Sequence, residues 1–380
     1  MNLESEPETL GVIGGGQLCR MICEAASPLG VEVVFLDPTP DAPAKPVADE
    51  QIVGDFDDFD PVSELVEKSD YLTYDIELAS PDVVEVEAGD VPVYPDPETL
   101  RTIQDKYVQK EALVERGVPV PRYRNVEDVD DLHEAADELG LPLMLKAREG
   151  GYDGRGNVRV ESRDEFEEAL ENLPEKVMVE EFLDYSRELS VIAIQGDGEI
   201  DSLPLTETIH EEQILRRTVT PARTSDEVEE EAREVAGQVL EAMEGRGVYG
   251  IEMFEVDGEV LVNEIAPRPH NSGHWSIEGA VSGQFEQHVR AVTGKPIGST
   301  ELRSPNVSHN ILGSGGPCRV NLGNVEAILD TPRAHLHWYG KKEERPLRKM
   351  GHYTLTGDEG ASTDELLEEA KGIRSRISFE

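Results

Sequence analysis

The 380-residue sequence has few cysteines, few aromatic residues and no long apolar run, and these shortages exclude several classes of protein. Cys19, Cys23 and Cys318 are too few and too scattered for a disulfide framework or a zinc site. No stretch offers about 18 uninterrupted apolar residues, so no membrane span is predicted. The acidic N-terminus leads directly into a predicted strand and does not fit a secretory signal. A reducing cytoplasm is therefore the expected location.

Basic residues are also scarce, with 35 Lys and Arg against 80 Asp and Glu and a formal net charge of −45. A field of this sign repels nucleic acid and anionic membranes, so neither is expected as a partner. The acidic residues are dispersed along the chain, which favours a halophilic surface, screened by salt, over a binding site for basic partners. Five of the few lysines fall in motif-like stretches, namely Lys106, Lys110, Lys146, Lys341 and Lys349.

The hydrophobic pattern predicts three α/β or α+β units, with boundaries near residues 100 and 300. Residues 10–38 read as strand, glycine turn, helix and strand, which is the βαβ start of a parallel sheet. One helix is predicted over residues 97–117, ending at a glycine. The last 80 or so residues suggest short strands and a small β-rich unit.

A glycine turn follows the first predicted strand. Gly14, Gly15 and Gly16 would let the backbone approach a phosphate at a helix N-terminus. A nicotinamide fingerprint would have glycine at position 19, where this chain has Cys19. Asp37, at the end of the next strand, keeps a dinucleotide alternative open, and a turn without a ligand is another. The preferred interpretation is the phosphate of a smaller ligand.

A second glycine-rich segment, residues 150–157, lies between two predicted strands. Such a loop can cover phosphates with backbone N–H groups, while Lys146 and Lys106 supply cations. A flexible exposed turn is the alternative. Further on, the segment from Glu180 to Leu183 passes from strand to loop, where backbone groups could meet an adenine edge and a carboxylate could meet ribose. A solvated acidic edge is the alternative there.

The hairpin formed by residues 249–268 carries the most specific signal. With a three-residue turn at 257–259, Glu252 faces Glu264 across the strands. Two like charges in this position are destabilising unless one is protonated or a cation lies between them. This register predicts Mg²⁺ bridging the phosphates of ATP. A two-residue Asp-Gly turn is the alternative register and would pair Glu252 with Asn263. Exposed acidic residues on a sheet edge, without a metal, are the alternative interpretation. The apolar pairs of the preferred register are Val256 with Val260 and Phe254 with Val262.

Together these stretches resemble the ATP-grasp superfamily and, within it, the 5-(carboxyamino)imidazole ribonucleotide synthases of purine biosynthesis. The resemblance covers nearly the whole chain and rests on "GGGQLCRM", "TYDIE", "QDKYVQK", "GGYDGRGN", "EEFL…RELS", "PLTETIH", "NEIAPRPHNSGHW" and "YGKKEERPLRKMGH". It implies an ATP-grasp architecture with an N-terminal Rossmann-like parallel-sheet domain at 1–100. An ATP-grasp domain at 101–300, with a lid subdomain at about 118–185, and a small C-terminal β-rich domain at 301–380 would follow.

The resemblance also implies an enzyme and its ligands. A homodimer would use ATP, Mg²⁺ and bicarbonate to carboxylate aminoimidazole ribonucleotide through carboxyphosphate, releasing ADP and phosphate. Mg²⁺ would be held by Glu252 and Glu264. The positions that would bind ATP are Lys106, Lys146, Gly151, Tyr152, Asp153, Gly154, Arg155, Gly156, Asn157, Glu180, Glu181, Phe182, Leu183, Glu188, His210, Asn263 and Glu264.

The same resemblance places the ribonucleotide and the reacting groups. Catalytic roles would fall to Asp153, Arg155, Arg268 and His274, with either Asp153 or His274 accepting the proton of the amine. The positions that would bind the ribonucleotide are Gly15, Gly16, Gln17, Tyr152, Asp153, His270, Asn271, Ser272, Lys341 and Arg348.

Two positions depart from the family pattern. Cys19 stands where the family usually has glycine, and Asp75 stands where it usually has Glu, which leaves the contact of that carboxylate open. Three alternative functions remain at this point. They are another ATP-grasp ligase of the purine pathway, using formate or glycine, a nicotinamide-dependent dehydrogenase, and a non-catalytic nucleotide sensor.

Overall fold

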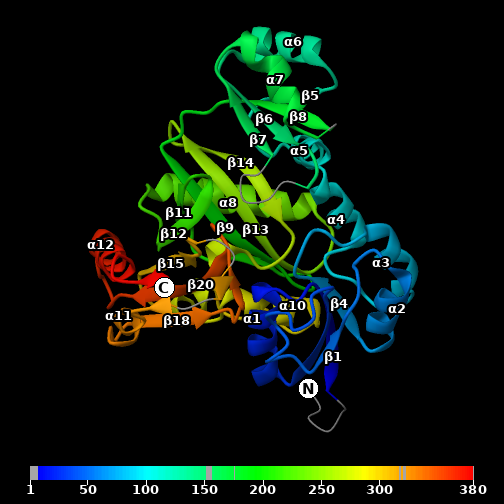
Figure 1. Cartoon of the computed structure of the whole chain (residues 1–380), viewed down its shortest axis with the longest axis vertical. Helices are drawn as coiled ribbons and strands as arrows, with labels where there is room; N and C mark the ends of the chain where they lie inside the picture. The colour runs from blue at the N-terminus through cyan, green and yellow to red at the C-terminus, as the bar shows by residue number, and fades with distance from the viewer. Residues whose placement is uncertain (1–6, 151–155, 175, 316–317, 320–321, 380) are drawn as a thin grey trace.

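The computed structural model describes residues 7–150, 156–174, 176–315, 318–319 and 322–379. Three main sheets follow one another from the N-terminal unit at the bottom of Figure 1, through a large central sheet, to a small sheet at the top. None of the described helices is long and apolar enough to cross a membrane. Two short strand pairs complete the described part: β16 (Cys318–Arg319) with β19 (Glu343–Glu344), and β17 (Leu322–Gly323) with β21 (Ser378–Phe379).

The N-terminal sheet is parallel, as predicted, and has the strand order β3-β2-β1-β4. Its strands are runs of buried apolar residues, typical of a parallel sheet covered on both faces. The glycine turn leads from β1 into α1. The elements are β1 (Glu8–Ile13), α1 (Gln17–Ala26), η1 (Ser27–Leu29), β2 (Val31–Leu36), β3 (Glu50–Ile52), α2 (Phe59–Glu67), β4 (Tyr71–Tyr74) and α3 (Pro81–Ala88).

The single helix predicted over residues 97–117 is wrong, because the chain forms two helices there. α4 (Pro97–Gln104) ends before Asp105, and α5 (Lys106–Glu115) begins after it. Asp105 has an extended backbone, and its carboxylate accepts hydrogen bonds from the N–H groups of Tyr107 and Val108. This N-cap starts a new helix in spite of the continuous helical periodicity. The break places Lys106 at the first position of α5.

The small sheet is antiparallel, with the order β5-β8-β6-β7, and two helices pack on it. Its own apolar core includes Leu132, Leu145, Phe166 and Val179. The elements are β5 (Tyr123–Val126), α6 (Val129–Leu139), β6 (Leu143–Ala147), β7 (Asn157–Val160), η2 (Arg163–Glu165), α7 (Phe166–Glu171) and β8 (Val177–Glu181).

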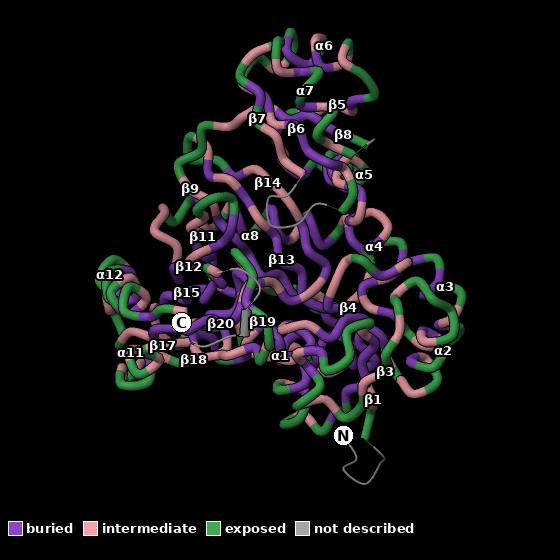
Figure 2. Tube along the Cα trace, viewed as in Figure 1, coloured by how far each residue is buried: buried purple, intermediate pink, exposed green. Residues whose placement is uncertain are grey.

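The central sheet has the order β14-β13-β9-β11-β12-β15-β20-β18, with β10 added beside β9. Figure 2 shows buried residues along the strands of this sheet and exposed residues in the segments around it. Its strands are β9 (Arg187–Gln195), β10 (Ile200–Ser202), β11 (Thr206–Glu211), β12 (Ile214–Thr220), β13 (Gly247–Val256), β14 (Glu259–Ala266), β15 (Asn306–Leu312), β18 (Ala334–Trp338) and β20 (Lys349–Thr356).

Different helices cover the two faces of the central sheet. Alternate residues of β9 separate these faces: Leu189 and Val191 pack with α8, whereas Ile192 packs with Trp275 and Ala291 on the other side. After residue 300, β15, β18 and β20 extend this same sheet, whereas the two short strand pairs lie outside it. The domain boundaries near 100 and 300 stay predictions. The helices are α8 (Asp226–Ala242), η3 (Asn271–Gly273), α9 (Ser276–Gly279), α10 (Gln284–Val292), α11 (Glu326–Leu329) and α12 (Thr363–Arg374).

The hairpin of β13 and β14 has a tighter turn than the preferred prediction. Asp257 and Gly258 form a two-residue turn with φ angles of 53° and 87°, so Val256 pairs with Glu259. Both residues occupy the left-handed region that such hairpin turns require, where glycine carries no steric penalty. The predicted three-residue turn at 257–259 is therefore wrong.

Nevertheless, Glu252 faces Glu264, as predicted. Asn263 is an extra residue on β14 between two paired positions, and this β-bulge moves the register by one residue. Without the bulge, the two-residue turn would pair Glu252 with Asn263. The turn is one residue shorter than predicted, and the bulge adds one residue to β14. These two differences offset each other, so the predicted pairing of the two carboxylates is correct.

The bulge also corrects the predicted apolar face of the hairpin. Val260 and Val262 are fully buried in the core that includes α8, with Met253 beside them. Phe254 pairs instead with Leu261, and both are half-buried on the face that carries the two carboxylates. The predicted pairs of Val256 with Val260 and Phe254 with Val262 are therefore wrong.

Candidate active site

Two of the predicted ATP-binding lysines reach β14 from the direction of the small sheet. Lys106, at the start of α5, places its Nζ 2.7 Å from Oε1 of Glu264. Lys146, on β6, places its Nζ 3.0 Å from Oδ1 of Asn263. The break between α4 and α5 and the bulge in β14 therefore bring these four side chains together.

Behind this group, a buried carboxylate joins two lysines. Glu180 lies 2.8 Å from Lys146 Nζ and 3.1 Å from Lys110 Nζ, and its side chain is only 3% exposed. Burial alone would raise the pKa of Glu180, but the two ammonium groups lower it to about 2. Burial also lowers the pKa of Lys110 to about 8. The Glu180 carboxylate, predicted to lie beside adenine or ribose, is thus engaged by two cations.

The facing carboxylates differ in their surroundings. Burial raises the pKa of Glu252, and the charges of Glu264 and Glu188 add to this rise against the opposing charge of His210. Burial would also raise the pKa of Glu264, but Lys106, with help from other cations nearby, holds it below its usual value. The charge of Glu264 therefore disfavours the ionised form of Glu252, whereas cations favour the ionised form of Glu264.

This donor set fits Mg²⁺. Glu252 and Glu264 offer hard oxygen ligands on one face of the hairpin, which is the chemistry that Mg²⁺ prefers. In the part of the chain that the structure describes, no group of three or more His, Cys, Asp or Glu side chains converges on one point. A Mg²⁺ ion here would therefore need phosphate oxygens and water to complete its coordination, as expected for an ion that arrives with ATP.

Glu188 and His210 form a tight pair on neighbouring strands of the same face. Nδ1 of His210 lies 2.5 Å from Oε2 of Glu188, and the Tyr185 hydroxyl donates to the other oxygen at 2.6 Å. Burial alone would lower the pKa of His210, but the hydrogen bond and charge of Glu188 raise it. Tyr185 also stacks on Phe254 at 4.7 Å between ring centroids. The structure thus brings together two predicted nucleotide residues beside an aromatic pair.

The segment after β14 returns to the carboxylates. Nδ1 of His270 lies 2.8 Å from the Ser272 hydroxyl, and Nε2 lies 3.8 Å from Oε1 of Glu252. Burial lowers the pKa of His270 well below its usual range, so the ring is neutral. Gly250 leaves room for it, because a Cβ there would lie 2.3 Å from the Cβ of His270. Ser190 fixes Ser272 through a hydroxyl contact of 2.6 Å.

Arg268 connects this segment to the N-terminal unit. Its guanidinium lies 2.8 Å from Glu77, a residue that the sequence analysis did not select. Asp75, the departure from the family pattern, is buried nearby, and its carboxylate accepts the N–H of Gly16 at 2.5 Å. Burial raises the pKa of Asp75 to about 7, although Arg268 opposes the rise. Cys19, the other departure, is fully buried in the core around α1.

The glycine turn already has partners for its N–H groups. Gly15 donates to Asp37 at 2.9 Å, and Gly16 donates to Asp75. Asp37 therefore binds its own turn, which argues against a dinucleotide ribose in that place. The predicted contact of this turn and Gln17 with a ribonucleotide phosphate stays a prediction. For these N–H groups to bind a phosphate, the carboxylates of Asp37 and Asp75 would have to move.

His274 lies deep in an aromatic cluster. Its ring is 1% exposed and lies 4.7 Å from His352 and 5.7 Å from Phe285, between ring centroids. Asn271 is also buried, and its side-chain amide has no hydrogen-bond partner among the described residues. The choice between His274 and Asp153 as proton acceptor stays a prediction.

The predicted C-terminal residues Lys341 and Arg348 lie in the loops on either side of β19. Lys341 donates to the carbonyl of Lys349 at 2.7 Å, and Arg348 donates to the carbonyl of Glu343 at 2.7 Å. The positive charge of Lys349 acts on Glu252. No role was predicted for Lys349 or Lys110. Lys349 could have been found because it follows Arg348, and Lys110 because it lies four residues after Lys106.

The remaining predicted positions either have contacts outside the carboxylate and lysine group or lie outside the part of the chain that the structure describes. Glu181 pairs with Arg122 at 2.7 Å, and Phe182 lies under the Arg159 guanidinium at 4.0 Å. Leu183 is half-exposed. Gly156 and Asn157 lead into β7, where Asn157 pairs with Lys146. The predicted residues that lie outside the described part are Gly151, Tyr152, Asp153, Gly154 and Arg155.

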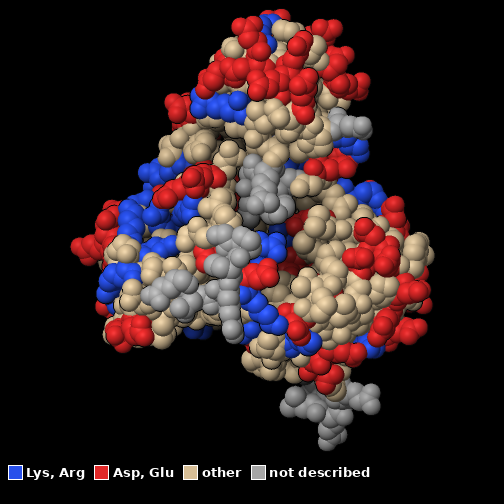
Figure 3. Space-filling model, viewed as in Figure 1, with Lys and Arg blue, Asp and Glu red and all other residues tan. Residues whose placement is uncertain are grey.

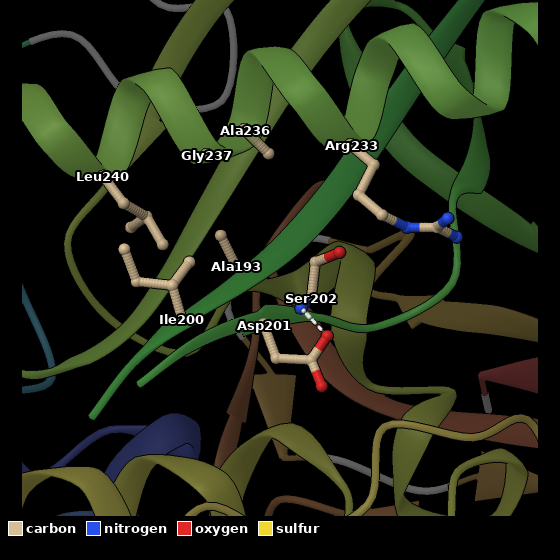
Figure 4. A pocket seen from close by; sticks show the side chains of 8 residues that line it. All are labelled: Ala193, Ile200, Asp201, Ser202, Arg233, Ala236, Gly237 and Leu240. Atoms are coloured by element: carbon tan, nitrogen blue, oxygen red, sulfur yellow. Dashed lines mark hydrogen bonds between the residues drawn. The ribbon is translucent and has the colours of Figure 1, made fainter. Parts of the chain in front are cut away.

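A separate small pocket lies on the opposite face of the central sheet, beneath α8 (Figure 4). Its volume is about 140 Å³, and none of the predicted site residues lines it. Its lining residues are Ala193, Ile200, Asp201, Ser202, Arg233, Ala236, Gly237 and Leu240.

The pair of Glu188 and His210 predicts a shifted histidine titration. In the protein without nucleotide, the pKa of His210 is expected above the usual histidine value. In Glu188→Gln this pKa should fall, because burial, which lowers it, is then opposed by the charge of Glu252 and no longer by Glu188. NMR of protein labelled at the histidine ring carbons, recorded from pH 5 to 9, measures both values. Equal pKa values in the two proteins would show that Glu188 does not control this ring.

Known proteins match the chain along almost its whole length. Residues 8–104 match the ribonucleotide synthetase preATP-grasp domain, residues 111–285 the ATP-grasp domain, and residues 306–366 the phosphoribosylaminoimidazole carboxylase C-terminal domain. The N5-carboxyaminoimidazole ribonucleotide synthase of Brucella melitensis biotype 1 is 40% identical over 91% of this chain and 95% of its own length. The phosphoribosylaminoimidazole carboxylases of Ogataea methanolica and Candida albicans are longer, and the chain spans 71% and 64% of them.

Solved structures agree. The N5-carboxyaminoimidazole ribonucleotide synthetase of Thermotoga maritima has a TM-score of 0.89 and 41% identity, covering 98% of this chain and 99% of its own. The enzyme of Aspergillus clavatus, in complex with ADP and 5-aminoimidazole ribonucleotide, has a TM-score of 0.90 and 35% identity, covering 97% of this chain and 98% of its own. The predicted ATP-grasp architecture, with its N-terminal parallel sheet and C-terminal domain, is confirmed. The chain belongs to the N5-carboxyaminoimidazole ribonucleotide synthase family of ATP-grasp ligases.

Proposed function

We propose that this protein uses ATP and bicarbonate to carboxylate the exocyclic amine of 5-aminoimidazole ribonucleotide, giving N5-carboxyaminoimidazole ribonucleotide, ADP and phosphate in purine biosynthesis. Full-length relatives with this enzyme name, and one solved with ADP and the ribonucleotide, support it. The observation that carries the proposal is the pair of facing carboxylates, Glu252 and Glu264, with Lys106 and Lys146 directed at the same strand.

The nucleotide half of the site binds negative charge. Lys106 and Lys146 would contact the phosphates of ATP, and Asn263 would lie beside them. Glu252 and Glu264 would hold Mg²⁺, which when bound offsets the charge of the phosphate oxygens. The half-buried Phe254 and the exposed ring of Tyr185, which stack on each other, provide an apolar surface near Glu188 and His210, where a base and ribose fit. Positioning and electrostatic stabilisation account for most of the catalysis in phosphoryl transfer.

The chemistry requires activation of a poor electrophile. Bicarbonate takes the γ-phosphoryl group of ATP to give carboxyphosphate and ADP. The amine then attacks the carbon of carboxyphosphate, with phosphate as the leaving group, or attacks the CO₂ that carboxyphosphate releases together with phosphate. The proton of the amine passes to Asp153 or His274. Arg268, fixed by Glu77 beside the carboxylates, would bind the anionic intermediate. The neutral imidazole of His270 would face the same position from Ser272. A fixed cation at this point stabilises charge without reorganisation.

The ribonucleotide half joins the N-terminal and C-terminal units. Lys341 and Arg348, on the C-terminal side, would contact the ribonucleotide. The buried amide of Asn271, next to Ser272, has no hydrogen-bond partner among the residues that the structure describes, which supports a polar ligand at this point. Arg155 and Asp153 would act between the two substrates.

The resemblance also supports a homodimer in the cytoplasm. The surface supports adaptation to salt: acidic side chains crowd the small-sheet unit at the top of Figure 3, while Lys and Arg gather toward the middle and left. Screening in concentrated salt would reduce the repulsion of the net charge of −45.

A phosphate-release assay in molar KCl tests the proposal. With ATP present, release should require both bicarbonate and 5-aminoimidazole ribonucleotide. Release that depends on formate or glycine would indicate another ligase of the pathway. Binding of ATP without release would indicate a nucleotide sensor, and a change of NADH fluorescence on mixing would indicate a dehydrogenase.

Glu264→Gln should reduce ADP formation by at least about two orders of magnitude, because the amide removes a negative oxygen ligand. Circular dichroism should show an unchanged fold. Glu259→Gln, on the same hairpin but exposed, is the matched control and should retain activity. Full turnover of Glu264→Gln would remove the metal assignment.

Lys341→Ala should raise the KM for the ribonucleotide on the order of tenfold, through loss of one charged hydrogen bond, and leave the KM for ATP nearly unchanged. Lys342→Ala is the control, because its side chain is 73% exposed and pairs with the exposed Asp41. Equal increases for both substrates would contradict the placement of the C-terminal unit over the ribonucleotide.

A further inference from the structure

We propose that Lys110 is a positioning residue of the nucleotide site: it neutralises Glu180, so that Lys146 keeps its positive charge for the triphosphate. The inference rests on the proposed function, because it takes ATP as the ligand of Lys146. Lys110 itself is 1% exposed, so it acts on the ligand only through its neighbours.

The geometry of α5 places two lysines for two different tasks. Lys106 and Lys110 are four residues apart, so their side chains lie on one face of the helix. Lys106 reaches Glu264 on β14 of the central sheet at 2.7 Å, whereas Lys110 reaches Glu180 on β8 of the small sheet at 3.1 Å. One helix therefore pairs with carboxylates from both sheets that enclose the nucleotide site.

Glu180 is shared between a buried and a more accessible lysine. Its Oε1 faces Lys110, and its Oε2 faces Lys146. Lys146 turns the rest of its ammonium group toward Asn263, on the strand that carries the carboxylate pair. The side chain of Lys146 is 11% exposed, compared with 2% for that of Lys110. Lys146 is thus the member of the pair that can meet a phosphate.

The charges of the three groups decide the result. With two lysines and one ionised glutamate, the group carries a net charge of +1, which attracts a polyanion. If Lys110 is lost or neutral, Glu180 cancels the charge of Lys146 and the group becomes neutral. In a partly buried site this difference is weakly screened by solvent, so it acts at full strength on a bound triphosphate.

The same arrangement makes nucleotide binding depend on pH. The groups that face Lys110 are Glu180 on β8, Lys146 on β6, Lys106 on its own helix, and the ring of Tyr123 on β5 at 6.0 Å. Burial, which is the largest effect, lowers the pKa of Lys110 to about 8. The lysine is therefore charged at pH 7 and mostly neutral at pH 9. Its support of ATP binding is present below this pKa and is lost as the pH rises through it.

Steady-state kinetics of three variants test the role of Lys110. Lys110→Met should raise the KM for ATP on the order of tenfold at pH 7, with a smaller effect on the KM for the ribonucleotide. Lys110→Arg stays charged at every pH tested and should restore the low KM. Lys371→Met, an exposed lysine on α12, is the matched control and should behave as the wild type.

The pH profile separates positioning from a merely structural role. From pH 7 to 9, the KM for ATP of the wild type should rise severalfold, while that of Lys110→Arg should stay flat in this range. Lys110→Met should be high throughout. If Lys110→Met does not fold, which circular dichroism reveals, the comparison of wild type with Lys110→Arg still decides. Identical profiles for these two proteins would overturn the inference.

The result can be distinguished from failure of the proposed function. If the wild type releases no phosphate with bicarbonate and the ribonucleotide, the proposed function fails. Calorimetric titration of ATP into the same proteins then tests Lys110 directly, with the dissociation constant in place of the KM. An ATP affinity that is the same in wild type and Lys110→Met would overturn the inference, whatever reaction the enzyme catalyses.

Discussion

The structure depends on one electrostatic constraint, the enforced approach of two carboxylates across the β13–β14 hairpin. The Asp257-Gly258 turn and the bulge at Asn263 fix this approach through the backbone, so the side chains cannot avoid it. Like charges in this position are destabilising, and the surrounding groups offset them: Lys106 contacts one carboxylate, and the charge of His210 acts on the other. In the proposed function, a divalent cation with phosphate oxygens would complete the compensation, so that nucleotide binding and metal binding would be one event at this site.

Positively charged residues are rare in this chain, and several of the few lysines lie together at the proposed nucleotide site. Of 11 lysines, Lys106, Lys110 and Lys146 converge on the junction of the small and central sheets, where they contact Glu180, Glu264 and Asn263. Ionised groups are costly to bury unless they are paired, so this group must keep its balance of charge in every state of the site. For the exposed acidic residues we propose a different purpose, hydration of the surface in salt. One composition thus supports a negative exterior and a locally cationic binding site.

The sequence predicted the parallel N-terminal sheet because apolar runs and glycine turns are local signals, and it predicted the ATP-grasp architecture through the resemblance of its motifs. The facing of Glu252 and Glu264 was predicted correctly although the turn was not, because the bulge offsets the shorter turn. It did not predict the break at Asp105, where one N-cap outweighs helical periodicity. The bulge at Asn263 was also missed, since nothing in the pattern distinguishes an extra residue from a longer turn. Burial was least predictable: Glu180 was predicted as a nucleotide contact and His274 as a catalytic residue, and the fold engages the first with two lysines and encloses the second among aromatic rings. Such partners come from distant segments and have no local signal.

The most direct test of this account is a crystal structure with Mn²⁺ and a non-hydrolysable ATP analogue, in which anomalous scattering locates the ion. One ion is expected, bound by oxygens of both Glu252 and Glu264 and by phosphate oxygens. Lys106 is expected to contact the phosphates, whether or not it also stays beside Glu264. An ion held elsewhere, with the two carboxylates turned apart and no ligand shared between them, would contradict it.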